Sequence, residues 1–265
     1  MKKIIKKLLK TLGFSIIRTN KSLERFSQEG SVENLNKVGF MPSIVVDGGG
    51  AYGNFSLMVS KFFPESRYFI VEPLIEYKNI LEKNVKKLNH KIFYNALSNN
   101  KETISINVHH DLVGTSIFEE YEEDNNGNKR DVDTILLSEL INDKDQILIK
   151  LDLQGAEILA LEGGLEVLKQ SRNIVVMCEA SFFKFYKSDR SKIYDLMQFF
   201  DSIDYELYDV YGPSFRPYDN AMAQIDVVFC HKESKLKSMN IYADKDKREA
   251  HNKKYIQKHK DMGIH

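Results

Sequence analysis

The sequence predicts an α/β fold, in which a mostly parallel seven-stranded sheet carries helices on both faces and ends in an antiparallel strand. From about residue 43, short apolar runs alternate with amphipathic stretches, which is the pattern of a parallel sheet with connecting helices. The last two apolar runs have no helix between them. The chain has 265 residues, of which 42% are hydrophobic and 29% charged, so it can bury one substantial core.

Residues 1–40 are predicted to form a basic amphipathic helix and a linker. Between residues 1 and 12, isoleucines and leucines recur at helical spacing, with lysines on the opposite face. The apolar runs are too short for a membrane span or a signal peptide. We favour a helix docked on the domain. The alternative is an interfacial helix, which would make peripheral contact through residues 1–12 with anionic lipid at the inner face of the membrane.

The main domain is expected over residues 41–231. Its first five strands are predicted at 43–47, 67–71, 91–95, 146–151 and 173–179. Helices are predicted at about 54–62, 75–88, 155–169 and 189–202. Residues 102–134 have a different hydrophobic pattern, in which short β-prone segments lead into a polar loop. We interpret this segment as an insertion near the site.

The domain is predicted to finish with two strands, Tyr205–Val210 and Ile225–His231. The loop between them contains Gly212, Pro213 and Pro217. Two strands joined without a crossover helix should be antiparallel. A parallel sheet that finishes in this way indicates the Rossmann-like class I methyltransferase fold rather than a dehydrogenase fold.

Charge is unevenly distributed, although Lys and Arg balance Asp and Glu over the whole chain. Residues 1–25 hold eight bases and one acid, and residues 232–265, a basic C-terminal extension, hold ten bases and five acids. The remaining body holds 20 bases and 32 acids, which argues against a nucleic-acid partner. Cys178 and Cys230 lie in apolar runs without metal-site spacing, so we expect buried thiols and a cytoplasmic location.

Residues 48–53 satisfy the G-x-G-x-x-G fingerprint, since Gly48, Gly50 and Gly53 follow a strand and precede a helix. In a dinucleotide-binding fold, the pyrophosphate lies on that helix N-terminus. Here Asp47 stands between the strand and the glycines, which disfavours a phosphate and suits a cation. S-adenosylmethionine carries a sulfonium and an ammonium but no phosphate, so the loop favours this cofactor. The competing interpretation of Asp47 is a helix cap.

Three later strands also end in acids. Glu72, before Pro73, ends the second strand, where a carboxylate can accept both ribose hydroxyls of either cofactor. In the fourth strand Lys150 and Asp152 interrupt an apolar run with period two. These two side chains should therefore pair with each other, with a neighbouring acid or with a ligand. Glu179 ends the fifth strand, so we expect one polar crevice at this edge of the sheet.

The ordered set of motifs resembles the FkbM family of methyltransferases over about residues 40–210. The motifs are Asp47-Gly48-Gly49-Gly50-Ala51-Tyr52-Gly53-Asn54-Phe55-Ser56, Val71-Glu72-Pro73, Asn95-Ala96-Leu97-Ser98, Gly114-Thr115-Ser116, Val132-Asp133-Thr134-Ile135 and Lys150-Leu151-Asp152-Leu153-Gln154-Gly155-Ala156-Glu157. The resemblance implies S-adenosylmethionine as donor and O-methylation of a hydroxyl on a sugar, a glycan or a secondary metabolite. The cofactor-binding residues that we expect are Asp47, Gly48, Gly49, Gly50, Tyr52, Gly53, Asn54, Phe55, Glu72, Pro73, Asn95 and Ala96.

The chain departs from the family pattern at two places. The first motif commonly reads D-x-G-A-N-x-G, whereas Gly50-Ala51 stands here in place of Ala-Asn, so one side-chain contact with the cofactor is expected to be missing. The usual acid of D-x-E-G-x-E is Gln154 here, which argues against a base at that position. Glu157 falls in the first turn of a helix, where the dipole favours an acid, so structural and catalytic roles are equally expected.

Methyl transfer requires the protein to align the acceptor, exclude water and remove one proton. We expect Asp152 to bind or deprotonate the acceptor hydroxyl. Lys150 would hold that carboxylate or the developing oxyanion, and Glu179 would position the acceptor. A carboxylate pair can hold a divalent metal, but the spacing does not require one.

Other bases and other functions stay open at this point. His109, His110 and His231 can act as bases, but we favour surface or structural roles, with the rings of the first two on opposite faces of a strand. The aromatic run Phe182-Phe183-Lys184-Phe185-Tyr186 can pack in the core or wall a sugar-binding pocket. Beside an O-methyltransferase of small molecules or glycans, the alternatives are an NAD(P)-dependent oxidoreductase and a non-catalytic Rossmann-like binding module.

Overall fold

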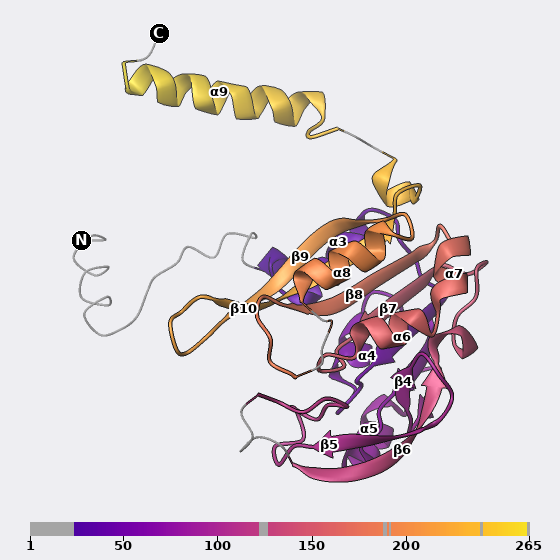
Figure 1. Cartoon of the computed structure of the whole chain (residues 1–265). Helices are drawn as coiled ribbons and strands as arrows, with labels where there is room; N and C mark the ends of the chain where they lie inside the picture. The colour runs from indigo at the N-terminus through magenta and orange to yellow at the C-terminus, as the bar shows by residue number, and fades with distance from the viewer. Residues whose placement is uncertain (1–23, 122–126, 188–189, 191, 239–240, 264–265) are drawn as a thin grey trace.

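The computed structural model describes residues 24–121, 127–187, 190, 192–238 and 241–263 (Figure 1). This part of the chain forms a seven-stranded sheet, a three-stranded sheet and helices that pack on both faces of the larger sheet. The helix that we expected over residues 1–12 lies outside the described residues. None of the described helices has both the length and the apolar character that crossing a bilayer requires.

The larger sheet has the strand order β3-β2-β1-β7-β8-β10-β9. Its strands are β1 (Ile44–Gly48), β2 (Arg67–Val71), β3 (His90–Phe93), β7 (Ile147–Leu151), β8 (Ile174–Ser181), β9 (Tyr205–Phe215) and β10 (Met222–His231). β10 is antiparallel to β8 and β9, whereas the pairs from β3 to β8 are parallel. The predicted class I methyltransferase fold is therefore confirmed.

Two layers of helices cover the larger sheet. One layer consists of α3 (Gln28–Lys37), α4 (Asn54–Val59) and α5 (Lys78–Val85), and the other of α6 (Glu157–Glu162), α7 (Leu165–Gln170) and α8 (Ile193–Asp201). The central strands are apolar on both sides, so that Ile149 packs toward the second layer and Leu148 toward the first. Cys178 and Cys230 are free and buried, as expected.

The helix expected over 155–169 is divided into α6 and α7. The chain breaks at Gly163, where a Cβ would lie 2.2 Å from the carbonyl oxygen of Ser98. Ser98 is the last residue of a short strand, β4 (Ala96–Ser98). The end of this strand contacts the chain at Gly163. Glycine is needed for this close approach, and the single long helix predicted from periodicity is therefore wrong.

The smaller sheet has the order β4-β6-β5, with β5 at Thr103–Val108 and β6 at Asn128–Leu136. These last two strands come from the segment that we interpreted as an insertion. Ile106 of β5 packs against Leu74 and Tyr77, which follow β2. Tyr77 ends a short 3-10 helix, η1 (Ile75–Tyr77). The small sheet thereby covers one end of the larger sheet, beside the carboxyl ends of its parallel strands.

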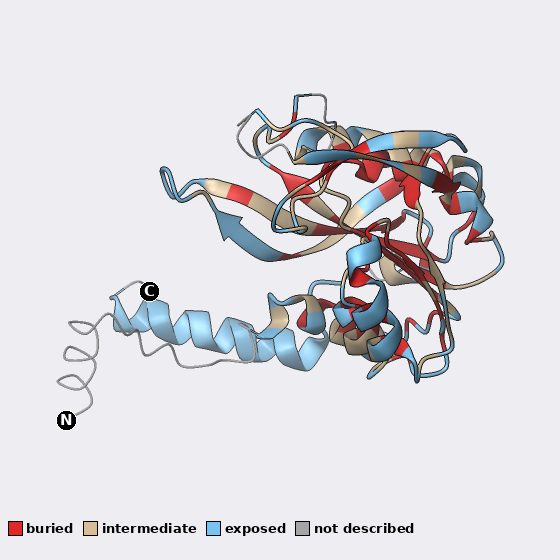
Figure 2. Cartoon of the chain, turned by 90° about the horizontal axis from the view of Figure 1, so that it is seen from below, coloured by how far each residue is buried: buried red, intermediate tan, exposed pale blue. Residues whose placement is uncertain are grey.

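The antiparallel pair β9–β10 is longer than predicted and projects from the body as a hairpin (Figure 2). The remaining short elements are the 3-10 helices η3 (Leu137–Glu139) and η4 (Lys235–Lys237). The last helix, α9 (Lys245–Asp261), contains no buried residue and lies apart from the body (Figure 1). The polar extension expected from its composition is thus a fully exposed helix.

Candidate active site

A cavity of about 290 Å³ lies beside the carboxyl ends of β1, β2 and β7 and is closed on one side by the loop that follows β5. Among the residues predicted to bind the cofactor, those that line this cavity are Gly49, Tyr52, Glu72, Pro73, Asn95 and Ala96. Those that do not line it are Asp47, Gly48, Gly50, Gly53, Asn54 and Phe55. Asp152 lines the same cavity, whereas Lys150 and Glu179 do not.

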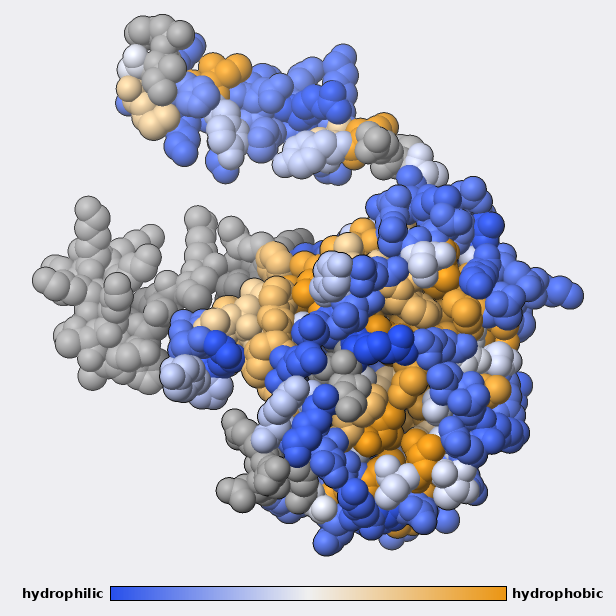
Figure 3. Space-filling model, viewed as in Figure 1, coloured by the Kyte–Doolittle hydropathy of each residue, from blue (hydrophilic) through white to orange (hydrophobic). Residues whose placement is uncertain are grey.

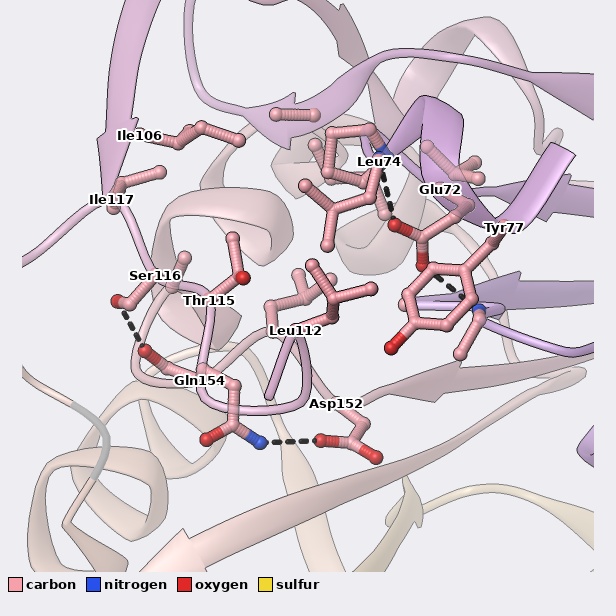
Figure 4. A pocket seen from close by; sticks show the side chains of 18 of the residues that line it. Glu72, Leu74, Tyr77, Ile106, Leu112, Thr115, Ser116, Ile117, Asp152 and Gln154 are labelled. Atoms are coloured by element: carbon pink, nitrogen blue, oxygen red, sulfur yellow. Dashed lines mark hydrogen bonds between the residues drawn. The ribbon is translucent and has the colours of Figure 1, made fainter. Parts of the chain in front are cut away.

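Glu72 is held inside the cavity by two backbone hydrogen bonds (Figure 4). Its Oε1 accepts from Leu74 N at 2.8 Å, and its Oε2 accepts from Ala51 N at 2.8 Å. The residue is only 4% exposed, and burial raises the pKa of its carboxyl although the two amides oppose the shift. Each oxygen retains a second acceptor position, so Glu72 can accept the two hydroxyls of a ribose.

The rest of the cavity is predominantly apolar. Tyr52 and Tyr77 meet edge to face with their ring centroids 4.8 Å apart, and both line the cavity. Ile106, Leu112 and Ile117 form the opposite wall (Figure 4). An apolar slot that contains the carboxylate of Glu72, with Asp152 at its border, suits a nucleoside, so the residues present fit S-adenosylmethionine. The three aliphatic residues were missed from the sequence, where only Gly114-Thr115-Ser116 pointed to this loop.

Asp47 lies beneath the glycine loop rather than in the cavity. Its side chain is fully buried, and Oδ2 accepts from the backbone N of Ser56 at 3.3 Å and from Ser56 Oγ at 2.7 Å. Burial raises the pKa of its carboxyl, against the effect of Lys150 Nζ, which lies 3.6 Å from Oδ1. This geometry is that of the competing helix-cap interpretation. The structure therefore gives Asp47 a role in holding the start of α4, and its binding of the cofactor, directly or through water, stays a prediction.

The glycine loop is shaped by contacts that leave no room for side chains. Gly49 has a φ of +74°, and a Cβ there would lie 2.1 Å from the carbonyl oxygen of Asp152. Gly53 has a φ of +78° and starts α4 in a left-handed conformation. The loop therefore packs directly on the segment that carries Asp152.

Lys150 links the glycine loop to Asp152. Its Nζ donates to the carbonyl oxygen of Gly49 at 2.9 Å and lies 3.4 Å from Asp152 Oδ2. Burial disfavours the charged form, but Asp152 and Asp47 together keep the pKa of Lys150 above its usual value. The prediction that Lys150 pairs with Asp152 or with another acid is confirmed, since Lys150 lies near both Asp152 and Asp47.

Asp152 lies where the cavity meets the outside, and its side chain is 45% exposed. Gln154 donates from Nε2 to Asp152 Oδ1 at 3.0 Å (Figure 4). Its Oε1 accepts from the hydroxyl of Tyr186 at 2.9 Å. Gln154 has a φ of +51°, so its backbone is held in a left-handed turn. The amide at position 154 thus orients Asp152, which an acid at this position would repel.

Three more carboxyls surround Asp152, and with it we call them the acid cluster: Asp152, Glu157, Glu179 and Asp226. Asp226 of β10 pairs in register with Glu179 of β8. Burial, together with the neighbouring acids, raises the pKa of Glu179 to about 9 and that of Asp226 to about 7. Asp226 was missed because an antiparallel strand begins, rather than ends, at this edge of the sheet.

Glu157 occupies a structural position with one unused oxygen. Its Oε1 accepts from Leu153 N at 2.8 Å and from Gly155 N at 3.4 Å, so it holds the turn that carries Asp152. Burial raises the pKa of this carboxyl to about 7. Its Oε2 is buried and has no hydrogen-bond partner among the described residues.

None of the histidines considered as bases, His109, His110 and His231, lines the cavity. His231 is buried and pairs in register with Tyr205, at the end of β10 remote from Asp226. The rings of His109 and His110 stack with centroids 4.2 Å apart, so the expectation that they point to opposite faces is wrong. β5 ends at Val108, and the alternation of a strand does not extend to them. No group of three described His, Cys, Asp or Glu residues is arranged to hold a metal ion.

When the chain is compared with known protein families, one family matches it. The Methyltransferase FkbM domain matches residues 47–207, which include the glycine loop and most of the acid cluster. Comparison with curated protein sequences gives no match.

Similar solved structures were also found. The chain is similar to precorrin-6y C5,15-methyltransferase from Geobacter metallireducens, with 13% identity, a TM-score of 0.44 and coverage of 77% of this chain and 89% of that chain. It is similar to an rRNA methylase from Streptococcus thermophilus, with 12% identity, a TM-score of 0.44 and coverage of 76% and 93%. A TehB-like SAM-dependent methyltransferase from Corynebacterium glutamicum gives 10% identity, a TM-score of 0.41 and coverage of 85% and 94%.

The family match spans more than half of the chain and agrees with the sheet order and with the nucleoside-sized cavity that contains Glu72. The order of motifs along the sequence is also that of the family. The chain belongs to the FkbM methyltransferase family, and it is an S-adenosylmethionine-dependent methyltransferase.

Proposed function

We propose that the protein is an O-methyltransferase that acts on a hydroxyl of a sugar, a glycan or a small secondary metabolite. The observation that carries this proposal is the geometry of the acid cluster, in which Asp152 borders the cavity beside Lys150 and the buried Glu179 pairs in register with Asp226. Glu179, with its pKa raised to about 9, is neutral and can donate a hydrogen bond. Asp152, beside Lys150, can accept one. A hydroxyl both donates and accepts, so it is the acceptor group that fits such a pair.

The cavity is the proposed place of the donor's nucleoside. Glu72 would accept the ribose hydroxyls, and Ile106, Leu112 and Ile117 would pack on the adenine. Gly49 lines the cavity with its backbone, and the absence of a side chain lets the loop pack on the carbonyl oxygen of Asp152. S-adenosylmethionine, when bound, supplies a methyl group that is activated by its sulfonium.

The acceptor side is the proposed place of proton transfer. Asp152 would accept the proton of the hydroxyl during transfer, because it is the member of the acid cluster that reaches the cavity. Lys150 would orient Asp152 through its contact at 3.4 Å. Glu179 and Asp226 would hold the acceptor by hydrogen bonds.

The charge of the body of the chain argues against nucleic acid as the acceptor. Residues 26–231 hold 20 bases and 32 acids, so a polyanion would meet an excess of negative charge. We therefore keep a small molecule or a neutral glycan as the proposed partner. The competing function is a non-catalytic binding module. In such a module the acid cluster would have no role in proton transfer.

Methyl transfer with isotopically labelled S-adenosylmethionine tests the proposal. The wild-type protein, incubated with extracts that contain glycans and small metabolites, should label a product that resists mild base, as an ether does. Asp152→Asn should lower the rate of transfer by about 10²–10⁴-fold and leave the affinity for S-adenosylhomocysteine unchanged. The matched control is Asp201→Asn, an exposed acid at the end of α8. Transfer at the wild-type rate by Asp152→Asn would contradict the proposal.

We also propose that the protein works in the cytoplasm, and we keep contact of residues 1–12 with the inner face of the membrane as the testable alternative to a helix docked on the domain. The basis is the amphipathic pattern of these residues, in which lysines face one side. Flotation with vesicles that contain anionic lipid should recover the full chain but not a variant lacking residues 1–12. Equal recovery of both proteins would contradict membrane contact through this segment.

A further inference from the structure

Tyr186, the last residue of the aromatic run that follows β8, is buried beside the site. It is 6% exposed, and its hydroxyl donates to Gln154 Oε1 at 2.9 Å. The other end of the same amide donates from Nε2 to Asp152 Oδ1 at 3.0 Å. Tyr186, Gln154 and Asp152 therefore form one hydrogen-bond chain, which ends on the carboxyl that borders the cavity.

The direction of this hydrogen-bond chain follows from the chemistry of its two ends. Asp152 Oδ1 accepts, so Gln154 presents its NH₂ group to Asp152 and its carbonyl oxygen to Tyr186. Burial and the neighbouring carboxyls raise the pKa of Tyr186 well above its usual value, so the phenol keeps its proton and can donate. An amide turned over would offer Asp152 no donor. The hydroxyl of Tyr186 thus favours the one amide orientation that bonds to Asp152.

Tyr186 is itself held in place by its backbone and by its ring. The backbone on both sides of it pairs with residues 119–121, through hydrogen bonds of 3.1 and 2.8 Å. A Cβ on Gly155 would lie 2.9 Å from Cδ2 of the Tyr186 ring, so the ring packs directly on the turn that follows Gln154. The hydroxyl therefore approaches the amide from a fixed position.

The backbone of Gln154 is held independently of Tyr186. Its carbonyl oxygen accepts from Ser116 Oγ at 2.6 Å (Figure 4). The backbone amides of the residues before and after it bond to Glu157 Oε1. Loss of the Tyr186 hydroxyl would therefore leave the turn in place and release only the side-chain amide.

We propose that Tyr186 is a positioning residue for methyl transfer, which acts through the amide of Gln154 to hold Asp152 toward the acceptor hydroxyl. This inference rests on the proposed function, in which Asp152 accepts the proton of that hydroxyl. Lys150 Nζ lies 3.4 Å from Asp152 Oδ2, so the carboxyl is held at both of its oxygens. Because Asp152 is 45% exposed, it would turn toward solvent without the amide, and a misplaced base slows transfer.

A double-mutant cycle of Tyr186→Phe, Gln154→Ala and the double variant tests this proposal. Phenylalanine keeps the ring that packs on Gly155 and removes only the hydroxyl. The matched control is Tyr205→Phe, because Tyr205 is also buried and its hydroxyl donates to the carbonyl oxygen of Leu168 at 3.2 Å, remote from the site.

Initial rates are measured with labelled S-adenosylmethionine at varied concentration, with extracts of glycans and small metabolites as the acceptors. They give the maximal rate and the KM for S-adenosylmethionine, and thermal melting gives the stability of each variant. The full chain serves throughout, since the exposed and mostly hydrophilic α9 lies apart from the body (Figure 3).

Tyr186→Phe and Gln154→Ala should each lower the maximal rate about tenfold and leave the KM for S-adenosylmethionine unchanged. The double variant should be no slower than Gln154→Ala, because the hydroxyl acts only through the amide. Tyr205→Phe should melt about as early as Tyr186→Phe and yet transfer at the wild-type rate.

Losses that multiply in the double variant would overturn the role of Tyr186, because the hydroxyl would then act by another route. A wild-type rate in Tyr186→Phe, together with the loss expected for Asp152→Asn, would also overturn it and leave the proposed function intact. A wild-type rate in Asp152→Asn would refute the proposed function and this role together.

Discussion

Asp47 and Asp152 stand at the ends of neighbouring parallel strands, and both approach the ammonium of Lys150, at 3.6 Å and 3.4 Å. Their surroundings separate their roles. Asp47 is fully buried and bonded to Ser56, so it supports the glycine loop. Asp152 is 45% exposed and borders the cavity, so it is able to meet an acceptor. Exposure, rather than residue type or strand position, distinguishes the two.

The departures from the family motif at Gly50 and Ala51 have opposite physical consequences. Ala51 has a φ of +41°, a conformation that asparagine tolerates better than alanine. We expect Ala51→Asn to raise the free energy of unfolding by about 0.5–1 kcal/mol. In contrast, a Cβ on Gly50 would lie 2.4 Å from Cγ2 of the buried Ile70. Gly50→Ala should therefore lower the free energy of unfolding by about 1–3 kcal/mol.

Urea unfolding of the two single variants and the wild-type protein measures both effects. Far-ultraviolet circular dichroism at a fixed temperature gives the midpoints and slopes. A stabilised Gly50→Ala variant would show that Ile70 moves aside without loss. A destabilised Ala51→Asn variant would show that the loop does not adopt the left-handed turn.

The raised pKa of Glu179 makes the stability of the protein dependent on pH. In the folded state the pKa is about 9, above the ordinary value of 4.5, so the folded state binds more protons between these two values. The stability that this proton confers is complete below pH about 4.5 and is lost as the pH rises to about 9. Asp226 changes stability in the same direction, because its pKa is also raised.

Glu179→Gln tests this dependence, because its amide stays neutral at every pH. Thermal melting between pH about 5 and about 9 should show a decline for the wild-type protein that is clearly smaller for the variant. The exposed control Glu65→Gln should decline like the wild type. Parallel curves for all three proteins would contradict a buried, protonated Glu179.

At the scale of the element, periodicity predicted strands well and helix ends poorly. The first five strands fell within three residues of their observed bounds, because each is an apolar run that ends in a polar residue. The break between α6 and α7 was not predictable, since it follows from the approach of Ser98 to Gly163. That contact joins segments far apart in the sequence, which no local pattern contains.

Gly163→Ala should lower the free energy of unfolding by about 1–3 kcal/mol, because a methyl group there meets a backbone carbonyl oxygen at 2.2 Å. Gly164→Ala is the matched comparison. A Cβ there would meet only the side chain of Leu137, at 3.0 Å, so we expect a smaller loss. Urea unfolding of the two variants gives the comparison. Equal loss in both would show that the Ser98 carbonyl does not constrain this break.

At the scale of the whole molecule, the body and α9 are separate in their packing. Every described residue of α9 is exposed, so a chain that ends at Ser238 should melt within about 1 °C of the full chain. A chain that ends at Ser234 should melt earlier, because it lacks Leu236, which packs on the core. Differential scanning calorimetry measures both. A large loss on truncation at Ser238 would reveal that α9 packs on the body.

The location of the site at one edge of the sheet was predictable from the sequence. The relative positions of its side chains were not. Acids at strand ends located the edge of the sheet where Glu72, Asp152 and Glu179 lie. The sequence could not reveal that Asp226 joins them from an antiparallel strand. Nor could it reveal that Asp47 is turned away from the cavity, because a carboxylate can face either a ligand or its own helix.

Calorimetric titration of S-adenosylhomocysteine into the wild-type protein, Glu72→Ala and Glu76→Ala tests most directly that the cavity holds the donor. Glu72 lines the cavity, whereas Glu76 bonds to Arg130 outside it. The wild-type protein and Glu76→Ala should bind alike, and Glu72→Ala should bind at least about tenfold more weakly, since two hydrogen bonds to a carboxylate are lost. Circular dichroism establishes that each variant is folded. Equal affinity of all three proteins, or binding of NAD(H) alone, would contradict this assignment of the cavity.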